Sequence, residues 1–203
     1  TPLPKQLVAD PLGILDLPEG FSYRILQRTG DLMSDGFLAP AAPDGMACFS
    51  HGDSEWVLMR NHEIDEGVPA NQTLGFSSTH AGGVTRLVLD RSDATVKSTN
   101  FILTGTSRNC SGGASPYGWL SCEETEEDGH GYVFLCDPFA PHRLPRVICR
   151  HLRPRRYPID LSSGQAARRQ AEMALQKRSA TGLRYNSAFL ASGRWFLLLL
   201  ISR

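Results

Sequence analysis

The segment Thr106–Glu124 combines side chains that bind metals of different kinds. It holds Cys110, a glycine pair at positions 112 and 113, and two adjacent glutamates at positions 123 and 124. A thiolate is a soft ligand, whereas carboxylates offer the hard oxygens that Ca²⁺ prefers. A glycine pair allows a turn in which backbone approaches a ligand closely. The segment predicts a loop that supplies unlike ligands to a mixed or multinuclear metal centre. The alternative is a strand that ends in a turn, with Cys110 simply packed.

Other polar side chains extend this candidate site. Asn61 and Glu63 follow the strand-like run Trp56–Arg60, at the kind of strand end where loops gather around a site. They are candidate oxygen ligands, with a solvated strand end as the alternative. Arg108 and Asn109 come directly before Cys110. Arg108 would either lower the pKa of the thiol or hold a phosphoryl group in its planar fork of donors.

The two glutamates at the end of the segment do not have equal roles. Adjacent residues of a strand point to opposite faces, so at most one of Glu123 and Glu124 faces a given site. They begin an acidic run that continues through Glu126, Glu127 and Asp128, and a solvated acidic loop is the competing interpretation.

Other chemistry finds little support in the sequence. His51, His62, His80 and His130 are scattered and form no HExxH motif. There is no GxSxG elbow, no P-loop and no GxGxxG sequence. The five cysteines are too widely spaced for a zinc ribbon or a dense disulfide framework.

The elements that must position these side chains read as short strands. Alternating or β-rich runs occupy residues 21–25, 56–60, 84–89, 95–103, 119–123 and 132–136. Turn residues separate them at Pro18–Gly20, Asp35-Gly36 and Pro43–Gly45, with an irregular segment between the last two turns. No helical periodicity is sustained before residue 140. The pattern predicts a mainly β fold of sandwich, barrel or propeller type.

The chain changes character near residue 140. Residues 1–140 hold 8 Lys/Arg and 19 Asp/Glu, a net charge of −11, whereas residues 141–203 hold 13 and 2, a net charge of +11. We therefore divide the chain into residues 1–140 and a basic tail, 141–203. Residues 142–158 show no clear strand or helix pattern, and residues 165–179 form the one expected short helix. The longest apolar run has seven residues, too few for a membrane span, and residues 1–30 contain no signal peptide pattern.

Several segments together resemble the PhoX-type alkaline phosphatases, a group of exported bacterial β-propeller proteins. The resemblance covers roughly residues 10–139. Its segments are residues 17–26, 28–31, 33–36, 43–46, 56–63 and 82–85, with the strongest at Gly105–Gly113 and Trp119–Glu124. It implies a calcium-dependent phosphatase that holds iron beside calcium and acts on a small phosphate ester in the periplasm or outside the cell.

The resemblance also assigns residues. Cys110 matches the iron-ligating cysteine, and Glu63 with Glu123 or Glu124 matches carboxylates near the metals. Arg108 and Asn109 would line the same site as catalytic groups. Residues 1–140 would then be the N-terminal portion of a propeller whose ring is incomplete.

The basic tail departs from the family. It is either the product of a frameshift near residues 140–150 or a real basic arm that engages an acidic surface. Nucleic acid is disfavoured as a partner because no recognition motif accompanies the charge. The sequence thus predicts a truncated metal-dependent phosphoric monoester hydrolase that is weakly active or inactive. The alternatives are an inactive metal-binding propeller fragment and a basic-tailed binding protein.

Overall fold

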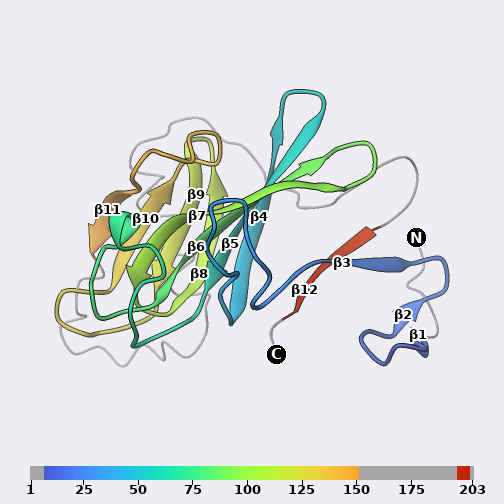
Figure 1. Ribbon diagram of the computed structural model, residues 1–203, viewed down its shortest axis with the longest axis horizontal. Helices are drawn as coiled ribbons and strands as arrows, with labels where there is room; N and C mark the ends of the chain where they lie inside the picture. Colours follow the sequence, from blue (N-terminus) through green and yellow to red (C-terminus); the bar gives the residue numbers. More distant parts are fainter. Residues whose placement is uncertain (1–6, 151–195, 202–203) are drawn as a thin grey trace, which may run out of the picture.

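Two four-stranded antiparallel sheets form the body of the protein (Figure 1). The computed structural model describes residues 7–150 and the backbone of residues 196–201. One sheet has the order β4–β5–β6–β7 and the other β11–β10–β9–β8. Their strands are β4 (Pro43–His51), β5 (Glu55–His62), β6 (Gly82–Asp90), β7 (Val96–Thr106), β8 (Asn109–Ser115), β9 (Gly118–Glu123), β10 (Tyr132–Cys136) and β11 (Arg146–Arg150).

Smaller elements lie outside these two sheets. β1 (Leu7–Val8) pairs with β2 (Leu17–Pro18), and β3 (Ser22–Arg28) pairs in parallel with β12 (Phe196–Ile201). A 3₁₀ helix, η1 (Gln72–Leu74), precedes β6 and is capped by the Asn71 side chain. Figure 1 shows β1, β2 and β3 extending away from the two larger sheets.

The two sheets pack on each other through one apolar cluster. From the first sheet it takes Val57, Met59, Val84, Val88, Ile102 and Leu103, and from the second Trp119, Phe134 and Cys136. Alternate residues of β5 and β6 lie on the opposite face, where Trp56, Leu58, Leu87 and Leu89 form a second buried cluster. The β4–β7 sheet is therefore buried on both faces, as in a layered β architecture.

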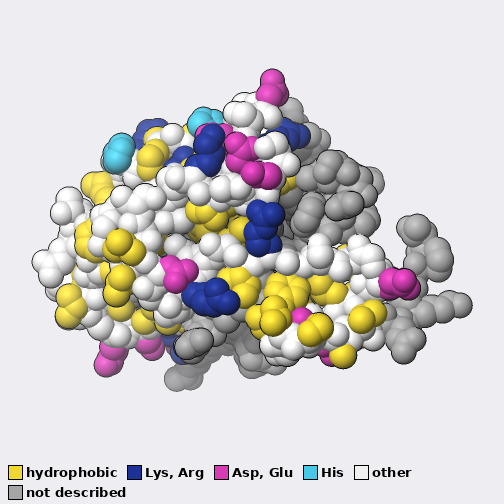
Figure 2. Space-filling model, turned by 45° about the vertical axis from the view of Figure 1, so that its right-hand side comes forward, with side chains coloured by type: hydrophobic (Ala, Val, Ile, Leu, Met, Phe, Trp, Pro, Cys, Tyr) yellow, Lys and Arg dark blue, Asp and Glu magenta, His cyan; other side chains and the backbone are white. Residues whose placement is uncertain are grey.

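The predicted mainly β fold is confirmed. The described sheets do not close into a ring, which is consistent with an incomplete propeller-like fold. All six strands expected from the sequence are present, and each end lies within three residues of the expected one. Several large apolar side chains remain exposed, among them Leu12, Leu32 and Leu38, and Figure 2 shows hydrophobic side chains gathered on the lower part of one face.

Three local predictions were wrong. Pro43–Gly45 is not a turn but the bulged beginning of β4. The glycine pair at 112 and 113 does not turn the chain, because both residues lie within β8. The turn of the β8–β9 hairpin comes later and ends at Gly118, whose φ is +131°. The basic segment 142–158, expected to be irregular, includes the edge strand β11.

The expected helix over residues 165–179 lies outside the described residues. Within the part of the chain that is described, no helix has the length and apolarity needed to cross a membrane.

Candidate metal centre

Three ligand side chains converge where the two sheets meet. Asp44 of β4, Glu63 directly after β5 and Cys110 of β8 each offer one atom, and these atoms all lie within 4.8 Å of one another. Two ligands of one ion lie at most about twice a metal–ligand bond apart, roughly 4–5 Å. The spacing therefore allows a single cation to contact all three residues. Each of them is half-buried.

Backbone contacts hold these residues together. The Asn61 side-chain amide donates to the carbonyl oxygens of Cys110 and Ser111, at 3.1 and 2.9 Å, and so ties β8 to the end of β5. The Glu63 amide donates to the Ala42 carbonyl oxygen, just before β4. At Gly45 a Cβ atom would lie 2.6 Å from the Cys110 carbonyl oxygen, so only glycine allows β4 to approach β8 this closely.

The charges of the site favour a bound cation. Burial, a hydrogen bond with Asp44 and the Asp44 charge raise the pKa of Glu63 above its usual value. Burial and the same neighbour raise the pKa of the Cys110 thiol to about 12, with Glu124 and Glu63 adding to the effect. The sequence suggested that Arg108 would lower the pKa of this thiol, but burial and the carboxylates outweigh any such effect. A cation would relieve this repulsion, and the sulfur and oxygen donors suit a soft and a hard metal together.

Arg108 places a compensating positive charge beside Glu63. Its Nη2 atom lies 3.3 Å from Glu63 Oε1, and its side chain is about half exposed. The residue has a φ of +49°, which is uncommon for a side chain larger than glycine. Its amide donates to Ile64 and its carbonyl oxygen accepts from Glu124, so the unusual backbone is held on both sides.

Glu123 and Glu124 point to different surroundings. Glu124 lies near enough for its charge to raise the pKa of both Glu63 and Cys110, although it is not one of the three converging ligands. Glu123 is 3% exposed, and its oxygens accept from the backbone amides of Ser107 and Tyr132 and pair with His130. The structure thus places Glu124 near the cluster and Glu123 in a separate buried network.

The two predicted asparagines lie beside the cluster, but the oxygen atoms of their side chains already accept hydrogen bonds from other protein groups. Asn61 Oδ1 accepts from Trp119 Nε1 and Ser121 Oγ, at 2.9 and 2.8 Å. Asn109 Oδ1 accepts from the Thr106 hydroxyl, and its Nδ2 donates to Ser121 Oγ. Both amides are fully buried and join β8 to its neighbouring strands.

The sequence reasoning missed Asp44 as a candidate ligand. The residue was interpreted as part of a turn, although it stands in one of the segments that carry the family resemblance, residues 43–46. That segment was the one available signal. The strand bulge that turns Asp44 toward Cys110 is not visible in the residue pattern.

Comparison with known proteins gives one result. The family model described as alkaline phosphatase PhoX matches residues 4–100. The matched range includes Asp44 and Glu63 and ends before Cys110 and Glu124. Curated proteins and solved structures gave no match. The resemblance stated from the sequence is thus confirmed over residues 4–100, and this chain carries an N-terminal partial match to the PhoX alkaline phosphatase family.

Proposed function

We propose that this chain carries part of the metal centre of a phosphoric monoester hydrolase. The single observation behind the proposal is the convergence of Asp44, Glu63 and Cys110, in a chain whose N-terminal part matches a family of metal-dependent phosphatases. Cys110 would hold iron, and the carboxylates of Asp44, Glu63 and Glu124 would hold calcium beside it. Such ions, when bound, neutralise a phosphate monoester and polarise its P–O bonds.

The residues of the chain have separable roles in this proposal. Arg108 is the group that contacts substrate: its exposed guanidinium would donate to two phosphoryl oxygens, exchanging its single 3.3 Å contact with Glu63 for a stronger bidentate one. Asn61 and Asn109 are positioning residues, because their buried amides fix β8 and hence the direction of the Cys110 side chain. The substrate is a small phosphate ester, and the location is the periplasm or the outside of the cell, as in the family.

We expect this chain to be weakly active or inactive. Ca²⁺ takes six to eight oxygen ligands. The Asp44–Glu63–Cys110 cluster and the nearby Glu124 together offer three carboxylates and a thiolate, so most of the coordination of calcium and iron is left to water or to other groups. This favours a metal-binding fragment over a competent enzyme. The proposed metals and reaction type are the same in both cases.

Metal content tests the proposal. The purified chain would be stripped of metal, incubated with Fe³⁺ and Ca²⁺, dialysed and analysed by elemental mass spectrometry. We expect iron and calcium to be retained together and a visible thiolate-to-iron absorption band. Cys110→Ser should lose both the band and the iron, whereas Cys149→Ser, on the edge strand β11, should keep them. Iron that survives Cys110→Ser would refute the assignment.

Activity is measured separately with p-nitrophenyl phosphate. Turnover at a rate typical of enzymes in the metal-loaded chain would contradict the expected weakness but not the metal site. Loss of the remaining turnover in Arg108→Ala, with metal content unchanged, would support a substrate-binding role for Arg108.

A further inference from the structure

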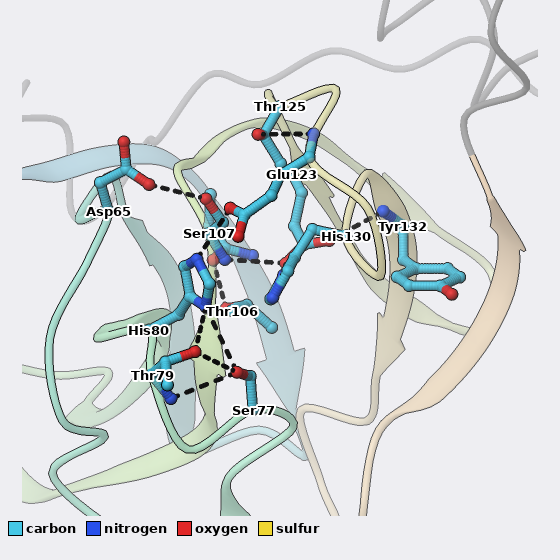
Figure 3. A network of polar contacts seen from close by, with 12 residues as sticks. Asp65, Ser77, Thr79, His80, Thr106, Ser107, Glu123, Thr125, His130 and Tyr132 are labelled. Atoms are coloured by element: carbon cyan, nitrogen blue, oxygen red, sulfur yellow. Dashed lines mark hydrogen bonds and ion pairs between the residues drawn. The ribbon is translucent and has the colours of Figure 1, made fainter.

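A second cluster of ligand side chains is built around two histidines. His80 lies between η1 and β6, whereas Glu127 and His130 lie in the loop that joins β9 to β10. One ligand atom from each of the three lies within 4.8 Å of the others. The two imidazole rings have centroids 3.9 Å apart, and His80 Nε2 lies 2.9 Å from Glu127 Oε2. Figure 3 shows both rings at the centre of this network.

The nitrogen Nδ1 of each ring is held by the protein. Nδ1 of His130 lies 2.8 Å from Glu123 Oε1, and a carboxylate that already accepts two backbone N–H bonds calls for a proton on that nitrogen. Nε2 of His130 then carries the lone pair, and no described residue hydrogen-bonds to it. A metal-binding histidine usually shows this arrangement, with its other nitrogen donating to a carboxylate.

His80 has hydroxyl partners in the same role. Its Nδ1 lies 3.2 Å from both Ser77 Oγ and Thr79 Oγ1, and either oxygen accepts a hydrogen bond. Without an ion, the 2.9 Å contact with the Glu127 carboxylate calls for a proton on Nε2 of His80. A bound ion would displace that proton, and the two hydroxyl oxygens would then accept from a proton on Nδ1, leaving the Nε2 lone pair for the ion. Glu127, the third ligand, is held close to His130 by a turn, because the His130 backbone amide donates to the Glu127 carbonyl oxygen.

The surroundings suit an ion that is bound from one open side. The two histidine side chains are buried, Phe76 packs edge-on against the His130 ring, and the Glu127 side chain is 49% exposed. Two imidazoles and one carboxylate are the ligand types of zinc and related ions, with a fourth position left for water. The β9–β10 loop and the segment before β6 come from different sheets, so an ion here would join them.

We propose that His80, Glu127 and His130 bind one divalent transition-metal ion of the zinc type, at a site separate from the Asp44–Glu63–Cys110 cluster. The inference does not depend on the phosphatase proposal, because none of its three ligands belongs to that cluster. Its expected ligand atoms are Nε2 of each histidine and one oxygen of Glu127.

Zinc titration of the full chain tests this site. The parent for the test is Cys110→Ser, which removes the competing thiolate. Competition with a fluorescent chelator should show one tightly bound Zn²⁺ per chain. Glu127→Gln should weaken binding at least tenfold. Glu126→Gln is the matched control: it removes the same charge at the neighbouring position, from a side chain that is not one of the three ligands. It should leave the zinc affinity within twofold of the parent.

Nuclear magnetic resonance of the imidazole nitrogens identifies the ligands. Zinc should shift the Nε2 resonances of two histidines in the parent and leave their Nδ1 resonances protonated. Because Glu127 is half exposed, Glu127→Gln should keep the metal-free melting temperature of the parent, so a loss of affinity reports on coordination. Absence of zinc binding, equal effects of the two glutamine variants, or unshifted Nε2 resonances would each overturn the proposal.

Discussion

Replacing each of the two neighbouring glutamates by glutamine should give opposite results. Glu123 accepts two backbone N–H bonds and one imidazole contact at 2.7–2.8 Å while 3% exposed. Glutamine has the same shape, but its NH₂ group cannot accept. Glu123→Gln therefore leaves at least one buried N–H facing another donor.

The cost of Glu123→Gln follows from hydrogen-bond energetics. A hydrogen bond to a charged group contributes about 1.5–3 kcal/mol, and a buried donor left unpaired costs about 1–3 kcal/mol. Because these two effects overlap, we expect the free energy of unfolding to fall by about 2–4 kcal/mol. Glu124→Gln should change it by less than about 0.5 kcal/mol, since that side chain is only a minor source of charge repulsion for Glu63 and Cys110.

Urea unfolding of the metal-free chain, followed by tryptophan fluorescence, measures both values. Calcium binding measured on the same two variants should show the reverse order, with Glu124→Gln the weaker binder. Equal unfolding energies for the two variants would refute the division of roles. So would a destabilised Glu124→Gln beside an unaffected Glu123→Gln.

Other substitutions test the packing and the charges. Asn61→Ala should lower the free energy of unfolding by about 2–4 kcal/mol in the same assay, because four hydrogen bonds, two of them fully buried, lose their partner; a change below about 0.5 kcal/mol would contradict it. Gly112→Ala should cost about 1–3 kcal/mol, since its Cβ would lie 2.1 Å from a carbonyl oxygen of β9, whereas Gly113→Ala, with nothing within 4 Å, should be near neutral. In the metal-free chain, Cys110, whose thiol pKa is raised to about 12, should react with iodoacetamide at pH 8 far more slowly than free cysteine does; equal rates would count against the raised thiol pKa. The raised pKa of Glu63 means that its protonated form is favoured on folding, so metal-free stability should fall as the pH rises from 4.5 through the raised pKa, and Glu63→Gln should flatten this fall in a pH series of melting temperatures.

The strands that the sequence predicted are those whose residues favour strands intrinsically. Residues 56–60 and 84–89 are rich in β-branched, aromatic and aliphatic side chains, and both became central strands. β8 was missed because Asn, Ser and Gly have little intrinsic preference for strands. Its stability comes from tertiary contacts, with the Trp119 ring packed over Gly112 and the Asn61 amide bonded to its backbone.

The candidate sites, too, depend on tertiary contacts that the residue pattern does not predict. Strand alternation predicted that Glu123 and Glu124 would separate, because side-chain direction in a strand has a period of two. It did not predict which of them would meet Cys110, since that depends on how two sheets pack. The second cluster was invisible in the sequence for a related reason: His80 and Glu127 are 47 residues apart and meet only through the fold.

The end of β9 links the two clusters physically. Glu124 adds its charge to the Asp44–Glu63–Cys110 cluster, and Glu123, its neighbour, holds the ring of His130. A cation at either site would therefore order the same short stretch of backbone, which Ser107 and Arg108 also contact through their main chains. Occupation of one site should stabilise the geometry of the other, because the loss of backbone freedom is shared between the two binding events. Zinc bound by His80, Glu127 and His130 is thus expected to raise the calcium affinity of the Asp44–Glu63–Cys110 cluster. By thermodynamic reciprocity, calcium should raise the zinc affinity by the same factor. Equal calcium affinities with and without zinc would show that the two clusters act independently.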